Sequence, residues 1–293
     1  MKFGANSSIY TFAVFISTNI TSILIGRFLG TYQLGQYNRA NALLALPMTN
    51  AVQPITQATL PVLARLRSMP EHYRQTYLSL VRKLNLVVVP ASIMLTFAAQ
   101  PIVAAVLGAK WAMAGKLLQI LGPAVAGLGF GYIVSDLFIT QNRSAELRTL
   151  GIFELFVRVT VVSVGVCFGI LMAALGYTIA TLIVVFVRIY AAGRSGPVTL
   201  RDHLEAAAPA IPVSVGTAAG CAAGLTAATV FSLSAGPTAI VICGAGGLCA
   251  AAAGLVFTAS RHAMVEVAAT LSVPGAAALL RRLSSPNAAG GGT

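Results

Sequence analysis

Charged residues are scarce in this chain, and their scarcity excludes an ordinary soluble domain. Asp, Glu, Lys and Arg make up 9% of its 293 residues, whereas soluble domains contain about 25%. Hydrophobic residues make up 57% and gather in runs close to the roughly 20 residues that cross a bilayer as a helix. The sequence therefore predicts an all-α, polytopic membrane helix bundle.

The chain also lacks the patterns that metal sites and enzymes require. Its four cysteines fall inside apolar runs without a CxxC pair, and its three histidines are scattered. Zinc sites need such ligands at short, regular spacings. No Ser-His-Asp, Cys-His or paired-carboxylate arrangement falls at a predicted bilayer surface. We therefore expect no metal, no cofactor and no enzymatic activity.

About eight transmembrane helices are predicted, because the apolar runs lack the alternation of membrane strands. The predicted spans are 8–29, 42–64, 84–107, 117–140, 149–171, 174–192, 207–231 and 237–258.

The net charge of +12 fits membrane orientation better than nucleic-acid binding. Its Lys and Arg residues lie in short connections between apolar runs, and such residues favour the cytoplasmic side. One set of alternate segments holds fourteen: Lys2, Arg65, Arg67, Arg74, Arg82, Lys83, Arg143, Arg148, Arg188, Arg194, Arg201, Arg261, Arg281 and Arg282. The other set holds four: Arg27, Arg39, Lys110 and Lys116. This asymmetry predicts that both termini are cytoplasmic and that no nucleic acid is bound.

Polar side chains interrupt the first two spans. Three of them in the second span follow helical spacing and should form one stripe: Asn50, Gln53 and Gln57. Three prolines at seven-residue intervals favour kinks in the same span: Pro47, Pro54 and Pro61. Asn19 is the best candidate in the first span. Such groups should face the bundle or a wet cavity, either as interhelical hydrogen-bond partners or as the lining of a translocation path.

Ionisable residues inside the later spans are the remaining site candidates. Glu154 and Arg158 are four residues apart and can pair on one helix face. The pair is either structural or a cavity charge, in which case Arg158 would meet an anionic substrate, because guanidinium binds phosphate and carboxylate as a fork. Glu154 and Asp136 are candidates for ion coupling. Asp136 is also consistent with a gate or a solvated helix end.

Two further features are expected to be structural. Arg201-Asp202-His203 falls in a connection and should be a solvated loop. The last two spans contain no charge and repeat small residues every four positions, as at Gly216, Gly220 and Gly224. Small residues let membrane helices approach closely, so these spans should pack with each other or against a partner.

An ordered series of short motifs resembles a known family. It includes Ile23-Leu24-Ile25-Gly26-Arg27, Leu34-Gly35-Gln36-Tyr37, Leu60-Pro61-Val62-Leu63-Ala64-Arg65 and Leu107-Gly108-Ala109-Lys110-Trp111. In this order the motifs resemble the polysaccharide transporter family, the oligosaccharide and O-antigen flippases of the multidrug/oligosaccharidyl-lipid/polysaccharide exporter superfamily. The resemblance implies that residues 1–192 form a six-helix lobe like the second lobe of such a flippase. Two additional Gly/Ala-rich helices would follow at 193–258, then an interfacial and disordered cytoplasmic tail at 259–293.

Members of that family have two lobes and move lipid-linked oligosaccharides between leaflets by alternating access. The resemblance therefore implies flipping of lipid-linked glycan repeat units across a bacterial cytoplasmic membrane, for exopolysaccharide, capsule or O-antigen assembly. Arg158 and Arg39 would meet pyrophosphate or acidic sugars. Because only one lobe is expected, the chain would be a truncated product, a subunit that pairs with a separate first lobe, or half of a homodimer. The alternatives are a non-transporting scaffold of a glycan-assembly complex and a drug or cation exporter.

Overall fold

The computed structural model describes residues 2–256, and every regular element among them is helical. The principal helices are α1 (Lys2–Leu29), α2 (Thr31–Pro47), α3 (Gln53–Arg65), α4 (Pro70–Phe97), α5 (Ala99–Val106), α6 (Ala112–Thr140), α7 (Ser144–Cys167), α8 (Ile170–Ser195), α9 (Leu200–Ala207), α10 (Ala210–Val230) and α11 (Ala235–Val256). The all-α prediction is confirmed for this part of the chain. The predicted tail at 259–293 lies outside the described residues.

Seven of the described helices are long and apolar enough to cross a membrane: α1, α4, α6, α7, α8, α10 and α11. The remaining predicted span, 42–64, is helical throughout, but it is divided among α2, a π-helical segment at Met48–Val52 and α3. Each of these pieces is shorter than the roughly 20 residues that a bilayer requires. The predicted count of about eight crossings thus corresponds to seven unbroken helices and one broken one.

Prolines account for the break in the second span. Pro47 and Pro54 flank the π-helical segment, and Pro54 has no N–H to donate to the carbonyl four residues earlier. The neighbouring Gln53 N–H instead donates to the carbonyl of Met48, five residues back. A π turn of this kind changes which side chains share a helix face.

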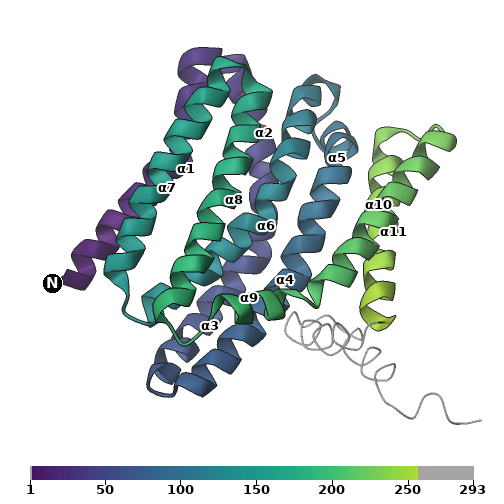
Figure 1. Ribbon diagram of the computed structural model, residues 1–293. Helices are drawn as coiled ribbons and strands as arrows, with labels where there is room; N and C mark the ends of the chain where they lie inside the picture. Colours follow the sequence, from purple (N-terminus) through teal and green to yellow (C-terminus); the bar gives the residue numbers. More distant parts are fainter. Residues whose placement is uncertain (1, 257–293) are drawn as a thin grey trace, which may run out of the picture.

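The helices form a bundle with a hairpin at one side (Figure 1). Helix α6 packs against α2, α4, α5 and α8, and α7 packs against both α1 and α8. The α10–α11 hairpin packs against α4 and α5, and α9 connects it to α8. The two ends of the described chain lie on the same side of the bundle, as an even number of crossings requires (Figure 1).

Tight turns close the opposite side. Gly30 between α1 and α2 and Gly169 between α7 and α8 have φ values of 90° and 105°. Residues with a Cβ rarely adopt this left-handed region, so glycine permits the chain to reverse there without a long loop.

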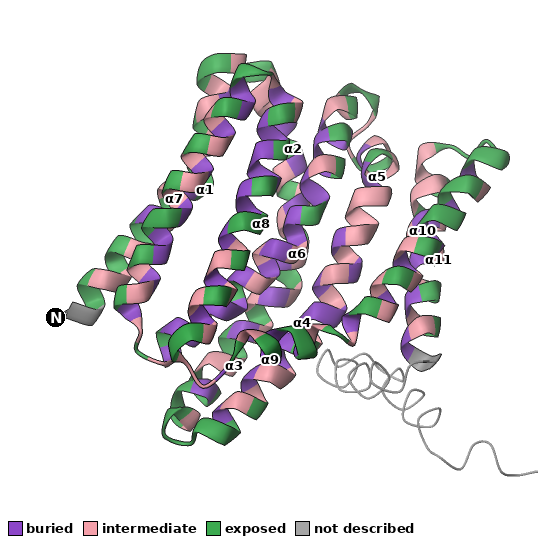
Figure 2. Ribbon diagram, viewed as in Figure 1, coloured by how far each residue is buried: buried purple, intermediate pink, exposed green. Residues whose placement is uncertain are grey.

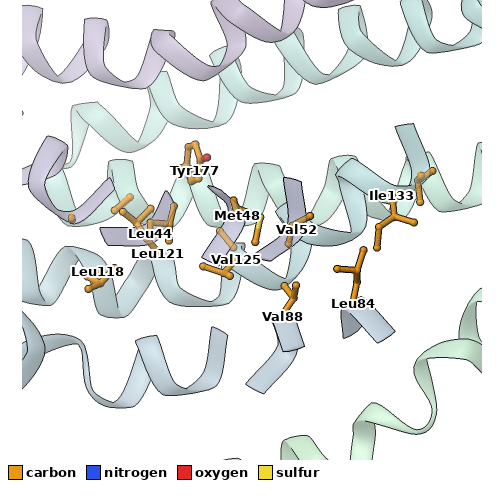
Figure 3. Close-up of a cluster of buried hydrophobic side chains, with 14 of the residues drawn as sticks. Leu44, Met48, Val52, Leu84, Val88, Leu118, Leu121, Val125, Ile133 and Tyr177 are labelled. Carbon is orange, nitrogen blue, oxygen red and sulfur yellow. The ribbon is translucent and has the colours of Figure 1, made fainter. Parts of the chain in front are cut away.

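The core and the outer surface of the bundle are both apolar. Figure 3 shows buried side chains from α2, α4 and α6 in one cluster, among them Leu44, Val88 and Leu121. Exposed positions recur along the outer helices (Figure 2), and large apolar residues are among them, including Phe156 and Phe186. Exposed phenylalanines on helices of this length face lipid more favourably than water, and the chain is a multi-pass membrane protein.

The connection predicted between the second and third spans is largely helical. Helix α4 begins at Pro70 and not at residue 84, so Arg74, Arg82 and Lys83 lie on a helix. A proline at the start of a helix loses no hydrogen bond, because the first N–H groups have no intrahelical acceptor.

The prediction that Arg201-Asp202-His203 is a solvated loop is wrong, because all three residues lie on α9 and only Arg201 is exposed. Asp202 and His203 are buried in α9. Asp202 accepts hydrogen bonds from the Arg74 Nε at 3.2 Å and from the Thr199 backbone N–H at 2.7 Å. His203 lies 3.1 Å from the Tyr77 hydroxyl. These contacts fasten α9 to α4.

The small residues of α10 lie against α11. A Cβ added at Gly216 would stand 2.7 Å from the Cys249 carbonyl oxygen, and one at Gly224 would stand 2.8 Å from the Ile242 Cα. The sequence left open whether the last two spans pack with each other or against a partner, and in the structure they pack with each other.

Candidate functional site

A cavity of about 450 Å³ lies inside the bundle. Its walls come from α1, α2, α3, α6, α7 and α8. Some of the lining residues, among them Thr11, Thr18 and Tyr132, are exposed. The cavity is therefore open to the surface at a rim that these residues form. Its volume is in the range of small-molecule binding sites.

The predicted Glu154–Arg158 pair is confirmed and forms part of the cavity wall. The Arg158 Nη2 donates to the Glu154 Oε1 at 2.9 Å, within one face of α7. The Arg158 guanidinium also lies over the Tyr177 ring, 4.6 Å from its centroid. A cation over an aromatic face is stabilised by the ring quadrupole, so two neighbours hold Arg158 in place.

Arg188 of α8 is the central member of this cluster. Its Nη2 donates to the second carboxylate oxygen of Glu154. Its Nη1 donates to the Ser135 hydroxyl at 3.0 Å and to the Gly131 carbonyl at 3.3 Å, both on α6. The Tyr10 hydroxyl of α1 lies 3.1 Å from the Ser135 hydroxyl. Arg188 therefore connects α6, α7 and α8, and it reaches α1 through Tyr10.

The cluster has an excess of positive charge. Two guanidiniums, Arg158 and Arg188, share the carboxylate of Glu154, and all three residues are more than nine-tenths buried. The Nε of each arginine has no hydrogen-bond partner in the described chain. Because unpaired charge is costly away from water, this arrangement favours an additional anion in the cavity.

Charge counting along the sequence misplaced Arg188. The charge count places it in a cytoplasmic connection, although it lies within the predicted span 174–192 and has apolar neighbours on both sides. The structure shows it buried instead. The continuing apolar run through Ile189, Tyr190 and Ala192 was the signal that identifies it as an intramembrane residue.

Two further predicted site residues line the same cavity. Gln53, directly after the π-helical segment, and Asp136 of α6 belong to its wall. Asp136 is partly buried and forms no ion pair within the part of the chain that the structure describes. The structure thus brings Gln53 and Asp136 to the same cavity as Glu154 and Arg158.

The other predicted candidates lie outside the cavity wall. Asn50, which lies in the π-helical segment, and Gln57 of α3 are both exposed. Asn19 is exposed and donates to the Phe15 carbonyl of its own helix at 2.8 Å. Arg39 is exposed and lies over the Trp111 ring, 5.2 Å from its centroid. The structure does not bring these four residues to Arg158.

Comparison with known proteins finds similarity to proteins named for polysaccharide biosynthesis. Residues 1–115 match the family model described as polysaccharide biosynthesis protein. The teichuronic acid biosynthesis protein TuaB of Bacillus subtilis is 32% identical over 113 residues, which are 39% of this chain and 23% of that protein. The lipopolysaccharide biosynthesis protein WzxC of Escherichia coli is 25% identical over 186 residues, which are 63% of this chain and 37% of that protein.

The aligned segments cover well under half of either relative. No solved structure shows a significant match to the chain. The family model and both relatives nevertheless agree on polysaccharide biosynthesis. The resemblance to the polysaccharide biosynthesis family is therefore confirmed over residues 1–115.

Proposed function

We propose that this chain moves lipid-linked oligosaccharide or polysaccharide repeat units across the bacterial cytoplasmic membrane. The observation that carries the proposal is the cavity in which Arg158 and Arg188 share one carboxylate. Guanidinium groups bind phosphate through paired hydrogen bonds, and lipid-linked glycans carry phosphate between lipid and sugar. The excess of arginine over carboxylate disfavours a cationic drug as the substrate.

The size of the cavity sets what part of the substrate it would hold. A volume of about 450 Å³ suits a phosphate and its adjoining sugar, not a complete glycan with its lipid. The exposed rim would admit this headgroup, while the lipid tail stays in the bilayer. Such transport needs no covalent catalysis, and Asp136 or Glu154 would couple it to an ion gradient.

The proposed arrangement assigns different roles to the parts of the chain. Residues 1–192 would form the transport lobe, and 193–258 an accessory hairpin. A second lobe would come from a separate subunit or from another copy of this chain. Within residues 2–256, and leaving out the arginines of the cavity, ten basic residues belong to one set of alternate connections and four to the other. Because basic residues favour the cytoplasmic side of a membrane, both termini would be cytoplasmic.

Complementation of a bacterial strain that lacks its polysaccharide flippase tests the proposal. The full chain should restore surface glycan. Arg158→Ala and Arg188→Ala should each abolish the restoration while the protein remains in the membrane at the same level. Arg201→Ala is the matched control, because Arg201 is 87% exposed at its side chain, where it pairs with Glu205 at the surface.

The outcomes distinguish a transporter from a non-transporting scaffold. Wild-type complementation by both cavity variants would exclude a substrate role for the arginines. If the unmutated chain fails to complement but co-purifies with glycan-assembly enzymes, it is a scaffold.

A further inference from the structure

The carboxylate of Glu154 lies between two cations. Its Oε1 accepts from Arg158 on the same helix, and its Oε2 accepts from Arg188 on α8. Each oxygen therefore serves a different guanidinium. In charge and position, this carboxylate occupies the place that an oxyanion ligand of the two arginines would take.

The carboxylate satisfies the two arginines only in part. It brings one negative charge to two positive ones. The Nε donors of Arg158 and Arg188 remain without an acceptor in the described chain, although both side chains are more than nine-tenths buried. Unsatisfied buried donors are rare and costly. The site thus has donors and charge for a larger anion than a carboxylate.

We propose that Glu154 is a resident counter-ion, which an incoming phosphate or diphosphate group displaces from Arg158 and Arg188. The inference rests on the proposed function and adds how the site changes between its empty and occupied states. A phosphate group carries up to two charges and three acceptor oxygens. It can therefore pair with both guanidiniums and also reach donors that the carboxylate leaves unsatisfied.

The same exchange explains why a carboxylate stands in an anion site. Two buried guanidiniums without any anion would destabilise the empty protein. Glu154 stabilises that state and competes with the ligand, so it weakens binding and promotes release. A transported group must leave on the far side of the membrane, and a site made of arginines alone would hold it more tightly.

The closing experiment measures pyrophosphate binding to the full chain in lipid nanodiscs, by calorimetry and by thermal unfolding. Glu154→Gln keeps the side-chain shape but removes the competing charge. We expect it to bind inorganic pyrophosphate at least about tenfold more tightly than the unmutated chain. Without pyrophosphate its unfolding temperature should fall, and saturating pyrophosphate should restore it.

A matched control comes from the same helix. Glu146 of α7 also pairs with an arginine, Arg143, at 2.6 Å, but it is 45% exposed at its side chain and lies outside the cavity wall. Glu146→Gln should leave pyrophosphate affinity unchanged. If Glu154→Gln cannot be purified, Glu154→Asp takes its place. A carboxylate one methylene shorter should lose one of its two guanidinium partners, so the affinity of this variant should also exceed that of the unmutated chain.

Three results would overturn the counter-ion role: unchanged or weaker pyrophosphate binding in Glu154→Gln, unchanged binding in Glu154→Asp, or the same gain in Glu146→Gln. If Arg188→Gln abolishes binding while Glu154→Gln leaves it unchanged, the anion site and the proposed function stand without the exchange. If no variant binds pyrophosphate, the counter-ion role is wrong, and complementation by the arginine variants judges the proposed function separately.

Discussion

The bundle of α1–α8 and the hairpin of α10 and α11 associate in different ways. The bundle buries three charged side chains beside a cavity, where Glu154 connects arginines on two helices. The hairpin helices contain no charged residue and approach each other through glycines. Close packing is the usual way for membrane helices to associate, whereas buried charge is costly and marks functional sites. The contrast supports the proposal that the bundle handles substrate and that the hairpin serves structural support.

The strongest test of this contrast removes the shared carboxylate. Glu154→Ala leaves two buried guanidiniums without their anion and should lower the free energy of unfolding by about 3–5 kcal/mol. Thermal unfolding in detergent measures the loss. Glu146→Ala, at a partly exposed pair on the same helix, should cost less than about 1 kcal/mol, and equal losses in the two variants would contradict the assignment.

Replacing the buried ion cluster of the bundle separates its effect on stability from its effect on function. The triple variant Glu154→Met, Arg158→Met and Arg188→Met replaces the ion cluster with apolar side chains, and such replacements are often neutral or stabilising. We expect it to recover most of the stability that Glu154→Ala loses, yet to fail in complementation. A triple variant that still complements would show that the charges serve packing alone.

The hairpin should be most sensitive to added volume. A Cβ at Gly216 would stand 2.7 Å from the Cys249 carbonyl oxygen, so Gly216→Val should separate α10 from α11 and cost about 1–3 kcal/mol. At Gly244 of α11 no atom lies within 4 Å of an added Cβ, and Gly244→Val serves as the control. Unfolding temperature in lipid nanodiscs reports the difference, and a similar effect of both variants would argue against close packing.

The junction between the two regions should weaken in acid. Arg74 and Thr199 hold the pKa of Asp202 well below its ordinary value, and burial lowers the pKa of His203. A carboxylate with a lowered pKa stabilises the fold above its unfolded pKa of about 4, and this contribution is lost as pH falls toward the folded value. His203 is buried neutral, so its contribution declines as pH falls below about 6.5.

Protease accessibility of the α8–α10 connection measures this acid response. Protease cleavage of this connection should begin to increase below about pH 6.5 and increase further below about pH 4. Asp202→Asn removes the lower step, and because Asp202 also caps α9, it should cost about 1–2 kcal/mol at neutral pH. An unchanged profile in His203→Asn would contradict the upper step.

The smallest effect is expected at the edge of the charged cluster. Tyr10→Phe removes a hydroxyl 3.1 Å from the Ser135 hydroxyl while keeping the ring beside Arg188. It should cost about 1 kcal/mol and leave pyrophosphate affinity nearly unchanged. Unfolding and calorimetry on the same sample check both statements, and a large loss of affinity would place Tyr10 among the ligand-binding groups.

Sequence alone determined the features that depend on neighbours along the chain. Apolar runs specified the membrane spans, because each run must by itself cover the bilayer. The four-residue spacing of Glu154 and Arg158 specified their pairing. The prolines of the second span predicted kinks, and the structure has a break there. All three predictions depend only on residues that lie close together along one predicted helix.

Tertiary structure decided which helices meet, and with that the composition of the site. Arg188 joins Glu154 across 34 residues, and Asp202 joins Arg74 across 128. Of the predicted polar stripe only Gln53 lines the cavity, whereas Asn50 and Gln57 are exposed. No local pattern specifies such partners, since they depend on how whole helices pack. The sequence predicted a membrane bundle with one ion pair in a span. Only the packing of the helices brought Arg188 to that pair and placed all three residues in the wall of a cavity.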